Sequence, residues 1–276
     1  MFGVVPKPLW ERRIAPDTRN RIPLAMRCLL IEHPDGLVLV DTGLGNKEDP
    51  RFHEIYGIEN AGQGGRTGLE DAIREAGHEP DAVRWVINTH LHFDHAGGNT
   101  WIERDPDGRP VAAARPSFPS ASYVVQRGEL EYARHTNERT RASYLPDNFD
   151  PVDAAGRWQL LDGEGMILPG ISARLTPGHV PHHQSILVES GGEGLCFLAD
   201  VMPTRHHLPL PWIMGYDLEP LRTLESKRRL HQEAMASGWW LCFEHDPEVV
   251  MGRLREGDRG VELGEQVAAP GSSDGP

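Results

Sequence analysis

The stretch HLHFDH, residues 90–95, places four potential metal ligands within six residues, directly after an apolar run. A strand that ends in a tight turn points His90 and His92 the same way and leaves Asp94 and His95 to face a neighbouring position. One short loop can therefore supply two adjacent metal ions. Imidazole and carboxylate ligands suit zinc, and also iron, manganese or cobalt, whereas structural zinc sites usually use thiolates. Chance surface histidines explain one or two of these residues but not the whole motif.

The composition is that of an ordinary globular protein. The 276 residues are 38% hydrophobic and 25% charged, which is enough to bury a core. The formal net charge of −13 argues against nucleic acid or an anionic membrane as a partner, because phosphate binding draws on clustered Lys and Arg. We therefore expect a small-molecule substrate that is neutral or cationic.

The cysteines and the hydropathy pattern bear on cellular location. Cys28, Cys196 and Cys242 each lie in an apolar run, which favours buried thiols over a disulfide framework. The first residues lack a basic segment followed by a long apolar stretch, and no later segment has the length of a membrane span. We therefore expect a cytoplasmic protein with no membrane partner.

Hydrophobic periodicity predicts an α/β protein. The run from Met26 to Ile31, a turn with Pro and Gly, and residues 37–40 are typical of a β-hairpin. Thr67 and Glu70 form a capping-box pattern, which starts a helix that stops at Gly77 and leads into the strand at residues 83–87. Further strands are expected at residues 122–125, 158–175 (two or three strands), 184–188, 195–198 and 239–243, and a helix at 218–237, with Asp217 as its N-cap and Gly238 beyond its end.

Two regions have less regular sequences. Residues 266–276 are largely small and polar, so we expect a disordered tail after a single domain at residues 1–265. The polar stretch from Glu129 to Asp150 has the composition of an insertion that caps a site or forms a homodimer contact. A solvated helix with a charged face is the interpretation that its composition favours.

Three more potential ligands lie where predicted strands end. They are His179 in TPGH at residues 176–179, Asp200 after the run at 196–199, and His245 after the run at 241–244. An ionised Asp directly after a buried apolar strand needs a partner, and a metal ion is one that serves. Each residue alone fits a turn or capping role. Together with the motif at residues 90–95, the three point to metal binding.

The order H-x-H-x-D-H, then His, Asp and His, resembles the metallo-β-lactamase superfamily over about residues 25–250. The resemblance implies an α/β fold, an αββα sandwich with the site at one edge of its two sheets. It also implies that Asp41, in Asp41-Thr42-Gly43, supports a ligand or a turn instead of binding metal. Carried over by position, the metal ligands are His90, His92 and His179 for one ion and Asp94, His95 and His245 for the other, with Asp200 bridging the two.

Several branches of the superfamily fit this chain poorly. Zinc β-lactamases generally have Cys or Ser where Asp200 stands, and flavodiiron proteins have Glu in place of His92 and a further flavodoxin domain. Glyoxalase II enzymes use a C-terminal helical extension to hold their thioester, and few residues follow His245 here. RNA-processing relatives need a basic surface for phosphates, which the acidic balance opposes.

The remaining branch contains lactonases, among them those that open N-acyl homoserine lactones, and phosphotriester hydrolases of the methyl parathion hydrolase type. The stretches at residues 90–99 and 176–185 resemble that branch. One difference concerns a Tyr that many homoserine lactonases carry shortly after the bridging Asp, since residues 201–204 read VMPT here. Either Tyr216 takes its place or the substrate differs.

The resemblance implies a dinuclear hydrolase, with zinc as the expected metal. A hydroxide that bridges the two ions is expected to attack a lactone carbonyl, with Asp200 as the bridging carboxylate and Asp94 as a proton carrier. A phosphotriester fits the same chemistry and is the alternative substrate. A metal-stabilised binding protein and a mononuclear iron dioxygenase are alternatives from other classes. The ligand set argues against the first because it leaves positions open for water, and a count of bound metal tests the second.

Four residues are predicted to contact the substrate, namely Phe93, His206, Trp212 and Tyr216. The loop at residues 208–216 is unusually apolar, which is typical of an acyl or aryl pocket, although ordinary packing on the core explains it equally well. His182 and His183 are expected to support ligands or to lie at the surface, since the two ions already have enough ligands.

Overall fold

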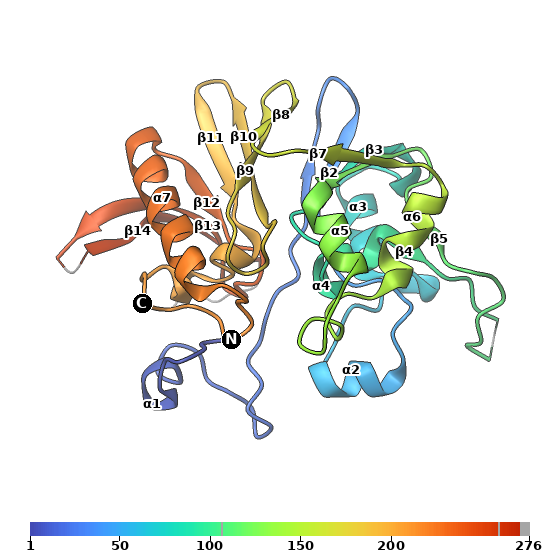
Figure 1. The fold of residues 1–276 in the computed structure, drawn as a ribbon, viewed down its shortest axis with the longest axis horizontal. Helices are drawn as coiled ribbons and strands as arrows, with labels where there is room; N and C mark the ends of the chain where they lie inside the picture. Colours follow the sequence, from blue (N-terminus) through green and yellow to red (C-terminus); the bar gives the residue numbers. More distant parts are fainter. Residues whose placement is uncertain (106, 259, 271–276) are drawn as a thin grey trace. The chain divides into compact units, whose positions relative to one another are not determined.

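The computed structural model describes residues 1–105, 107–258 and 260–270, and it divides into two compact units (Figure 1). The central unit is Cys28–Asp162. The composite unit joins Met1–Arg27 to the chain from Gly163 onward.

The central unit contains a five-stranded sheet in the order β1-β2-β3-β6-β7. β1 pairs antiparallel with β2, whereas β2, β3, β6 and β7 are parallel neighbours. Parallel strands bring their carboxyl ends to one edge of the sheet, which is where ligand loops usually lie. The strands are β1 Leu29–Ile31, β2 Leu37–Val40, β3 Val83–Ile87, β6 Ser122–Gln126 and β7 Trp158–Leu161.

Helices and short turns accompany this sheet. The capping box predicted at Thr67 and Glu70 is present at the start of α3, where each residue bonds the other's backbone. Ile73 of α3 packs against Val83, Val86 and Tyr123 in the buried core. The helices are α2 Pro50–Tyr56, α3 Gly68–Glu75, α4 Phe93–Ala96, α5 Arg127–Arg134 and α6 Asp150–Ala154; β4 Thr100–Trp101 pairs with β5 Arg115–Pro116; and the 3-10 turns are η1 Gln63–Gly65, η2 Pro80–Ala82, η3 Gly97–Asn99 and η4 Pro146–Asn148.

The composite unit contains a seven-stranded sheet in the order β14-β13-β12-β11-β10-β9-β8. Its only parallel pair among the described strands is β11 with β12, and α7 makes the crossover between them. Leu230 and Ala234 of α7 pack against Leu241 and Phe243 in the core. The elements are α1 Lys7–Trp10, β8 Gly165–Leu168, β9 Ile171–Leu175, β10 Gln184–Ser190, β11 Glu193–Phe197, η5 Ala199–Val201, η6 Arg205–His207, α7 Pro220–Ser237, β12 Trp240–Cys242, β13 Val249–Gly257 and β14 Gly260–Ala268.

The predicted hairpin, the strands between residues 83 and 243 and the α7 helix are present, with shifted ends. β1 begins at Leu29, later than the predicted Met26. α7 begins at Pro220 after Glu219, so the predicted N-cap role of Asp217 is wrong. Gly238 ends the helix in the left-handed region, at a φ of 67°, as its position predicted.

Two further sequence predictions need correction. β14 reaches Ala268, so the predicted tail does not begin at residue 266, and its residues 271–276 lie outside the described part of the chain. The stretch from Glu129 to Asp150 is not simply a solvated helix, because Glu129 and Tyr144 are buried. No helix in the described residues is long and apolar enough to span a bilayer. The cytoplasmic location and the homodimer stay predictions.

A buried lysine organises the loop before α7. Lys227 has no exposed surface, and its Nζ donates to the carbonyl oxygens of Pro209, Leu210 and Trp212 at 2.8, 3.2 and 2.9 Å. Burial lowers the pKa of Lys227 to about 7. Three carbonyl acceptors match the three donors of an ammonium group, so this contact fixes the course of residues 209–212.

Buried histidines of the composite unit make its stability depend on pH. His207 is buried between Thr204 Oγ1 and the carbonyl of Met1, and Phe2 stacks on its ring at 4.9 Å. Burial lowers the pKa of His207 to about 3, and those of His206 and His231 to about 4. These rings stay neutral in the folded protein at pH values where the unfolded chain binds protons.

We expect the free energy of unfolding to fall as the pH drops from about 6.5 toward 4, because the unfolded state then binds more protons than the folded state. Replacing His207 by Gln removes one of these groups. Urea denaturation of the metal-free protein at pH 7 and pH 5 measures the effect. The loss of stability between these pH values should be about 2 kcal/mol smaller in the variant than in the parent. An equal loss in both would contradict the assignment.

Candidate metal centre

In the central unit the potential ligands and the carboxylate that supports them follow the carboxyl ends of two parallel strands. Asp41 comes directly after β2, and the motif at residues 90–95 follows β3. The backbone N–H of Asp41 donates to the carbonyl of Ile87 at 2.9 Å, which ties the two strand ends together. Asp41 has a φ of 53°, in the left-handed region that non-glycine residues rarely adopt. Such strain persists where surrounding contacts impose it.

The contacts of Asp41 determine which nitrogen of two imidazoles carries the proton. Asp41 Oδ2 lies 3.1 Å from His95 Nδ1 and accepts the hydroxyl proton of Thr89 at 2.6 Å. Having donated its one proton, the Thr89 oxygen accepts from His90 Nδ1, 3.1 Å away. His90 and His95 therefore carry their protons on Nδ1, and their Nε2 lone pairs are the ones suited to bind a metal. The resemblance-based expectation that Asp41 supports a ligand agrees with this geometry.

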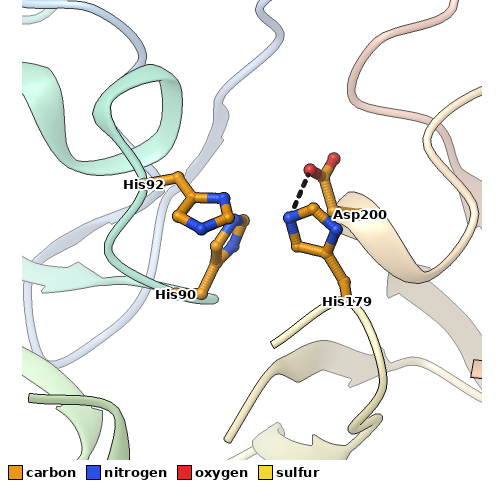
Figure 2. Close-up of side chains that lie close together, drawn as sticks. All are labelled: His90, His92, His179 and Asp200. Carbon is orange, nitrogen blue, oxygen red and sulfur yellow. Dashed lines mark ion pairs between the residues drawn. The ribbon is translucent and has the colours of Figure 1, made fainter. Parts of the chain in front are cut away.

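The three imidazoles of the motif lie close together and are buried. The ring centroids of His90 lie 4.6 Å from His92 and 4.0 Å from His95. Figure 2 shows His90 and His92 projecting from the loop that follows β3. Asp94 is the more accessible member, with 30% of its side chain exposed and Oδ2 3.8 Å from His95 Nε2. Neutral imidazoles and a carboxylate gathered in this way suit a divalent ion such as zinc.

The glycines after the motif let a second chain segment approach. A Cβ on Gly98 would lie 2.3 Å from the carbonyl oxygen of Thr42, and one on Gly97 would lie 2.8 Å from the nitrogen of Gly45. The Thr42 N–H donates to the carbonyl of His95 at 2.7 Å. The residues after the ligands must therefore be glycine for the β2 loop to pack here.

In the composite unit, His179 lies in the loop between β9 and β10. Gly178 before it has a φ of +140°, and a Cβ there would lie 2.2 Å from the backbone nitrogen of Thr223 in α7. The N–H of Leu218 donates to the carbonyl of His179 at 3.1 Å. Asp217 Oδ1 lies 3.0 Å from His179 Nδ1, so this carboxylate accepts the Nδ1 proton.

Asp200 follows β11 in the short turn η5. Ala199 before it has a φ of 49°, the second strained non-glycine position next to a potential ligand. The backbone N–H of Asp200 donates to His183 Nε2 at 3.2 Å, and His183 Nδ1 lies 2.8 Å from Thr176 Oγ1. His183 is therefore a buried support for Asp200, in keeping with its predicted supporting role, while His182 is exposed.

Each carboxylate oxygen of Asp200 faces an imidazole nitrogen. Asp200 Oδ2 lies 3.0 Å from His179 Nε2, the contact dashed in Figure 2, and Oδ1 lies 3.0 Å from His245 Nε2. His245 Nδ1 donates to the carbonyl of Ala25 at 2.7 Å, so its Nε2 also holds the lone pair. Two acceptors at 3.0 Å repel unless a proton or a metal ion lies between them. The donor chemistry thus fits a carboxylate that serves two cations.

The predicted substrate residue of the central unit packs with other aromatic side chains. The ring centroid of Phe93 lies 4.9 Å from Phe52 and 5.2 Å from Tyr56, both on α2. Tyr56 is 47% exposed and the neighbouring Ile55 is 51% exposed. An apolar surface of the central unit therefore adjoins the loop at residues 90–95.

The other predicted substrate residues lie in the composite unit and differ in exposure. Trp212 contacts Phe2 edge-on at 5.6 Å and carries the Arg13 guanidinium over its ring at 4.4 Å. Tyr216 is 59% exposed, whereas His206 is buried. Contact of these residues with substrate stays a prediction.

Sequence patterns missed several residues that hold the potential ligands in place. Asp217 was assigned to a helix cap because Asp before a helix is the usual cap signal. Thr89 and Ala25 carry no pattern, because a hydroxyl or a carbonyl becomes a ligand support only through the fold. Glu129, which accepts from the backbone N–H of Leu91 at 3.0 Å, was assigned to a solvated helix.

Comparison with known proteins gives a consistent set of relatives. The family model of the metallo-beta-lactamase superfamily matches residues 23–239. An N-acyl homoserine lactonase from Bacillus cereus is 30% identical over 237 residues, covering 83% of this chain and 84% of that protein. A probable metal-dependent hydrolase from Staphylococcus aureus has a TM-score of 0.84 at 26% identity, covering 98% of this chain and 91% of that one. An N-acyl homoserine lactone hydrolase with N-hexanoyl-L-homoserine bound at its catalytic metal centre has a TM-score of 0.61 at 26% identity, covering 81% of this chain and 82% of that one.

The contact between Asp217 and His179 predicts an effect on metal binding. Replacing Asp217 by Asn keeps the size of the side chain but removes the charge that stabilises the Nδ1 proton. We expect zinc affinity to fall about 10- to 100-fold, measured by competition with a chromogenic chelator. Asp162→Asn, which removes an exposed carboxylate paired with Arg127, is the control and should leave the affinity unchanged. Equal affinity of both variants would rule out the supporting role of Asp217.

Proposed function

Because this chain belongs to the metallo-β-lactamase superfamily, we propose that it is a two-metal hydrolase that opens a lactone ring, with N-acyl homoserine lactones as the first candidate substrates. The observation that carries the proposal is the environment of Asp200, whose two oxygens each face an imidazole Nε2 at 3.0 Å. A carboxylate in that position suits a bridge between two ions. The curated relatives named as lactonases support the choice of substrate.

The proposed ligands form two sets. Each set contains only imidazole and carboxylate donors, which suit zinc. We assign His90, His92, His179 and Asp200 to one ion, and Asp94, His95 and His245 to the other, with Asp200 shared by both.

Two divalent ions bound there would generate a hydroxide from water at neutral pH and polarise the carbonyl under attack. The protein's own groups then orient and move protons. Asp41 and Asp217 keep the Nδ1 protons of His95 and His179 in place, which maintains the ligand tautomer. Asp94 is partly exposed and can exchange a proton with water, so we propose that it carries the proton to the leaving alkoxide.

The aromatic surface beside the ligand loop supports an apolar acyl group on the substrate. Phe93 lies next to Asp94 in sequence and packs with Phe52 and Tyr56 of α2. An acyl chain that contacts this surface removes apolar area from water, which favours binding. Trp212, Tyr216 and His206 are proposed as further substrate contacts from the composite unit.

A substrate panel tests the proposal directly. The zinc-loaded and cobalt-loaded proteins are assayed on a long-chain N-acyl homoserine lactone, a simple γ-lactone, an aryl phosphotriester and a chromogenic β-lactam. We expect two metal ions per chain and the highest kcat/KM on the lactones. Dominant phosphotriester or β-lactam turnover, or two bound ions with no lactone turnover, would overturn the substrate assignment. One bound ion would overturn the dinuclear site.

The environment of Asp200 predicts opposite effects on activity and on stability. In Asp200→Asn we expect kcat to fall roughly 100-fold or more, with less than two metal ions bound by elemental analysis. The metal-free variant should be at least as heat-stable as the metal-free parent, because an amide N–H can donate to a facing Nε2 lone pair. A variant with full activity and full metal content would exclude the bridging role.

A further inference from the structure

One buried carboxylate contacts the backbone between two proposed ligands. Glu129 lies in the first turn of α5 and has no exposed surface. Its Oε1 accepts from the backbone N–H of Leu91 at 3.0 Å and from the hydroxyl of Tyr144 at 2.8 Å. Leu91 stands between His90 and His92 in the chain, so the hydrogen bond acts on the peptide that separates the two imidazoles.

The second partner of Glu129 contacts one of these imidazoles. Tyr144 is 2% exposed, and its ring meets His92 edge-on, with centroids 4.7 Å apart and planes at 67°. On another side Tyr144 contacts Tyr132 of α5 at 5.8 Å. Burial raises the pKa of Tyr144 well above its usual value, and the negative charge of Glu129 raises it further. The hydroxyl therefore remains a donor. Its position is therefore fixed at both ends, by the carboxylate and by the packing of the ring.

We propose that Glu129 and Tyr144 are positioning residues that set the orientation of His90 and His92, and thereby the affinity and coordination geometry of the metal ion these ligands hold. The proposal rests on the proposed function only in that His90 and His92 bind metal. Glu129 acts on the main chain between the ligands, and Tyr144 acts on the ring of His92. Neither residue is assigned a contact with substrate.

Energetics favour this role. A buried carboxylate is costly unless strong hydrogen bonds satisfy it, and Glu129 meets a backbone N–H and a phenol within 3.0 Å. Thr89 contacts Nδ1 of His90 and Asp41 contacts Nδ1 of His95, the imidazoles before and after His92 in the motif. The packing of Tyr144 supplies His92 with an orienting contact of a different kind. Groups that orient a ligand typically change metal affinity about 10- to 100-fold when they are removed.

A purely structural role of Glu129 and Tyr144 would predict a loss of stability without a specific change in metal binding. Glu129 also joins α5 to the ligand loop, and removing that connection lowers stability whether or not metal is bound. Tyr144→Phe separates the two roles, because it keeps the ring and deletes only the hydroxyl. Tyr123→Phe is a matched control in the same unit: Tyr123 is buried, and its hydroxyl donates to the carbonyl of Asn99 at 3.0 Å and accepts from Phe118 N–H at 3.1 Å.

The test uses the full chain freed of metal with a chelator and titrated with Co²⁺ alone, followed by the visible d–d spectrum and by thermal unfolding. We expect the parent to bind two Co²⁺ ions. Tyr144→Phe and Glu129→Gln should weaken one of the two binding steps about 10-fold or more and shift the d–d bands of that ion. Tyr123→Phe should lower the melting temperature with unchanged Co²⁺ affinity and spectrum.

The outcomes separate this inference from the proposed function. If the parent binds two ions and Tyr144→Phe matches its affinity and spectrum, the positioning role is wrong while the dinuclear site stands. If Tyr123→Phe weakens Co²⁺ binding as much as Tyr144→Phe, the effect is general destabilisation and the role is again wrong. A parent chain that binds no Co²⁺ would overturn both. Should Glu129→Gln fail to fold, Tyr144→Phe alone decides.

Discussion

The proposed site in the composite unit depends on two contacts of the Asp200 carboxylate. Its two oxygens face the Nε2 atoms of His179 and His245. Each of its oxygens lies 3.0 Å from an imidazole Nε2, and the Nδ1 proton of each ring is committed elsewhere. Such an arrangement is unfavourable without a cation and favourable with one. The surroundings hold it in place: Asp217 fixes one ring, the carbonyl of Ala25 fixes the other, and His183 accepts from the backbone of Asp200.

Strain is concentrated at the same places. Among the described residues, the non-glycine positions with positive φ are Asn20, Asp41 and Ala199, and two of these three adjoin potential ligands. Such a conformation costs on the order of 1–3 kcal/mol and persists only where other contacts impose it. At Asp41 those contacts are the hydrogen bonds from Thr89 and His95. After Ala199, the backbone N–H of Asp200 is held by its hydrogen bond to His183 Nε2. Both strained residues therefore lie just after a strand. There the chain turns so that a carboxylate, that of Asp41 or Asp200, faces an imidazole.

The sequence predicted the parts of the site that depend on local spacing, namely the motif at residues 90–95 at a strand end and the single ligand-type residues after three other strands. It also predicted the capping box and Gly238, because a cap is a short-range hydrogen-bond pattern. Supports that act across the chain were not predictable in the same way. Asp217 holds a residue 38 positions earlier, and Glu129 bonds a backbone N–H 38 positions earlier. Strands β13 and β14 were missed because two irregularities, at Val249–Met251 and Gly252–Leu254, shift their pairing register, so the alternation that marks a strand is interrupted.

Each unit orients its own proposed ligands. Thr89 and Asp41 act on His90 and His95 inside the central unit, while Asp217 and Ala25 act on His179 and His245 inside the composite unit. This explains why the N-terminal segment belongs with the C-terminal part of the chain: Ala25 also donates its N–H to the carbonyl of His245, and Arg27 donates to that of Glu244, both at 3.1 Å. Ligands oriented before metal arrives need less ordering on binding. On the proposed ligand assignment, the groups behind the imidazoles therefore contribute to metal affinity together with the imidazoles themselves.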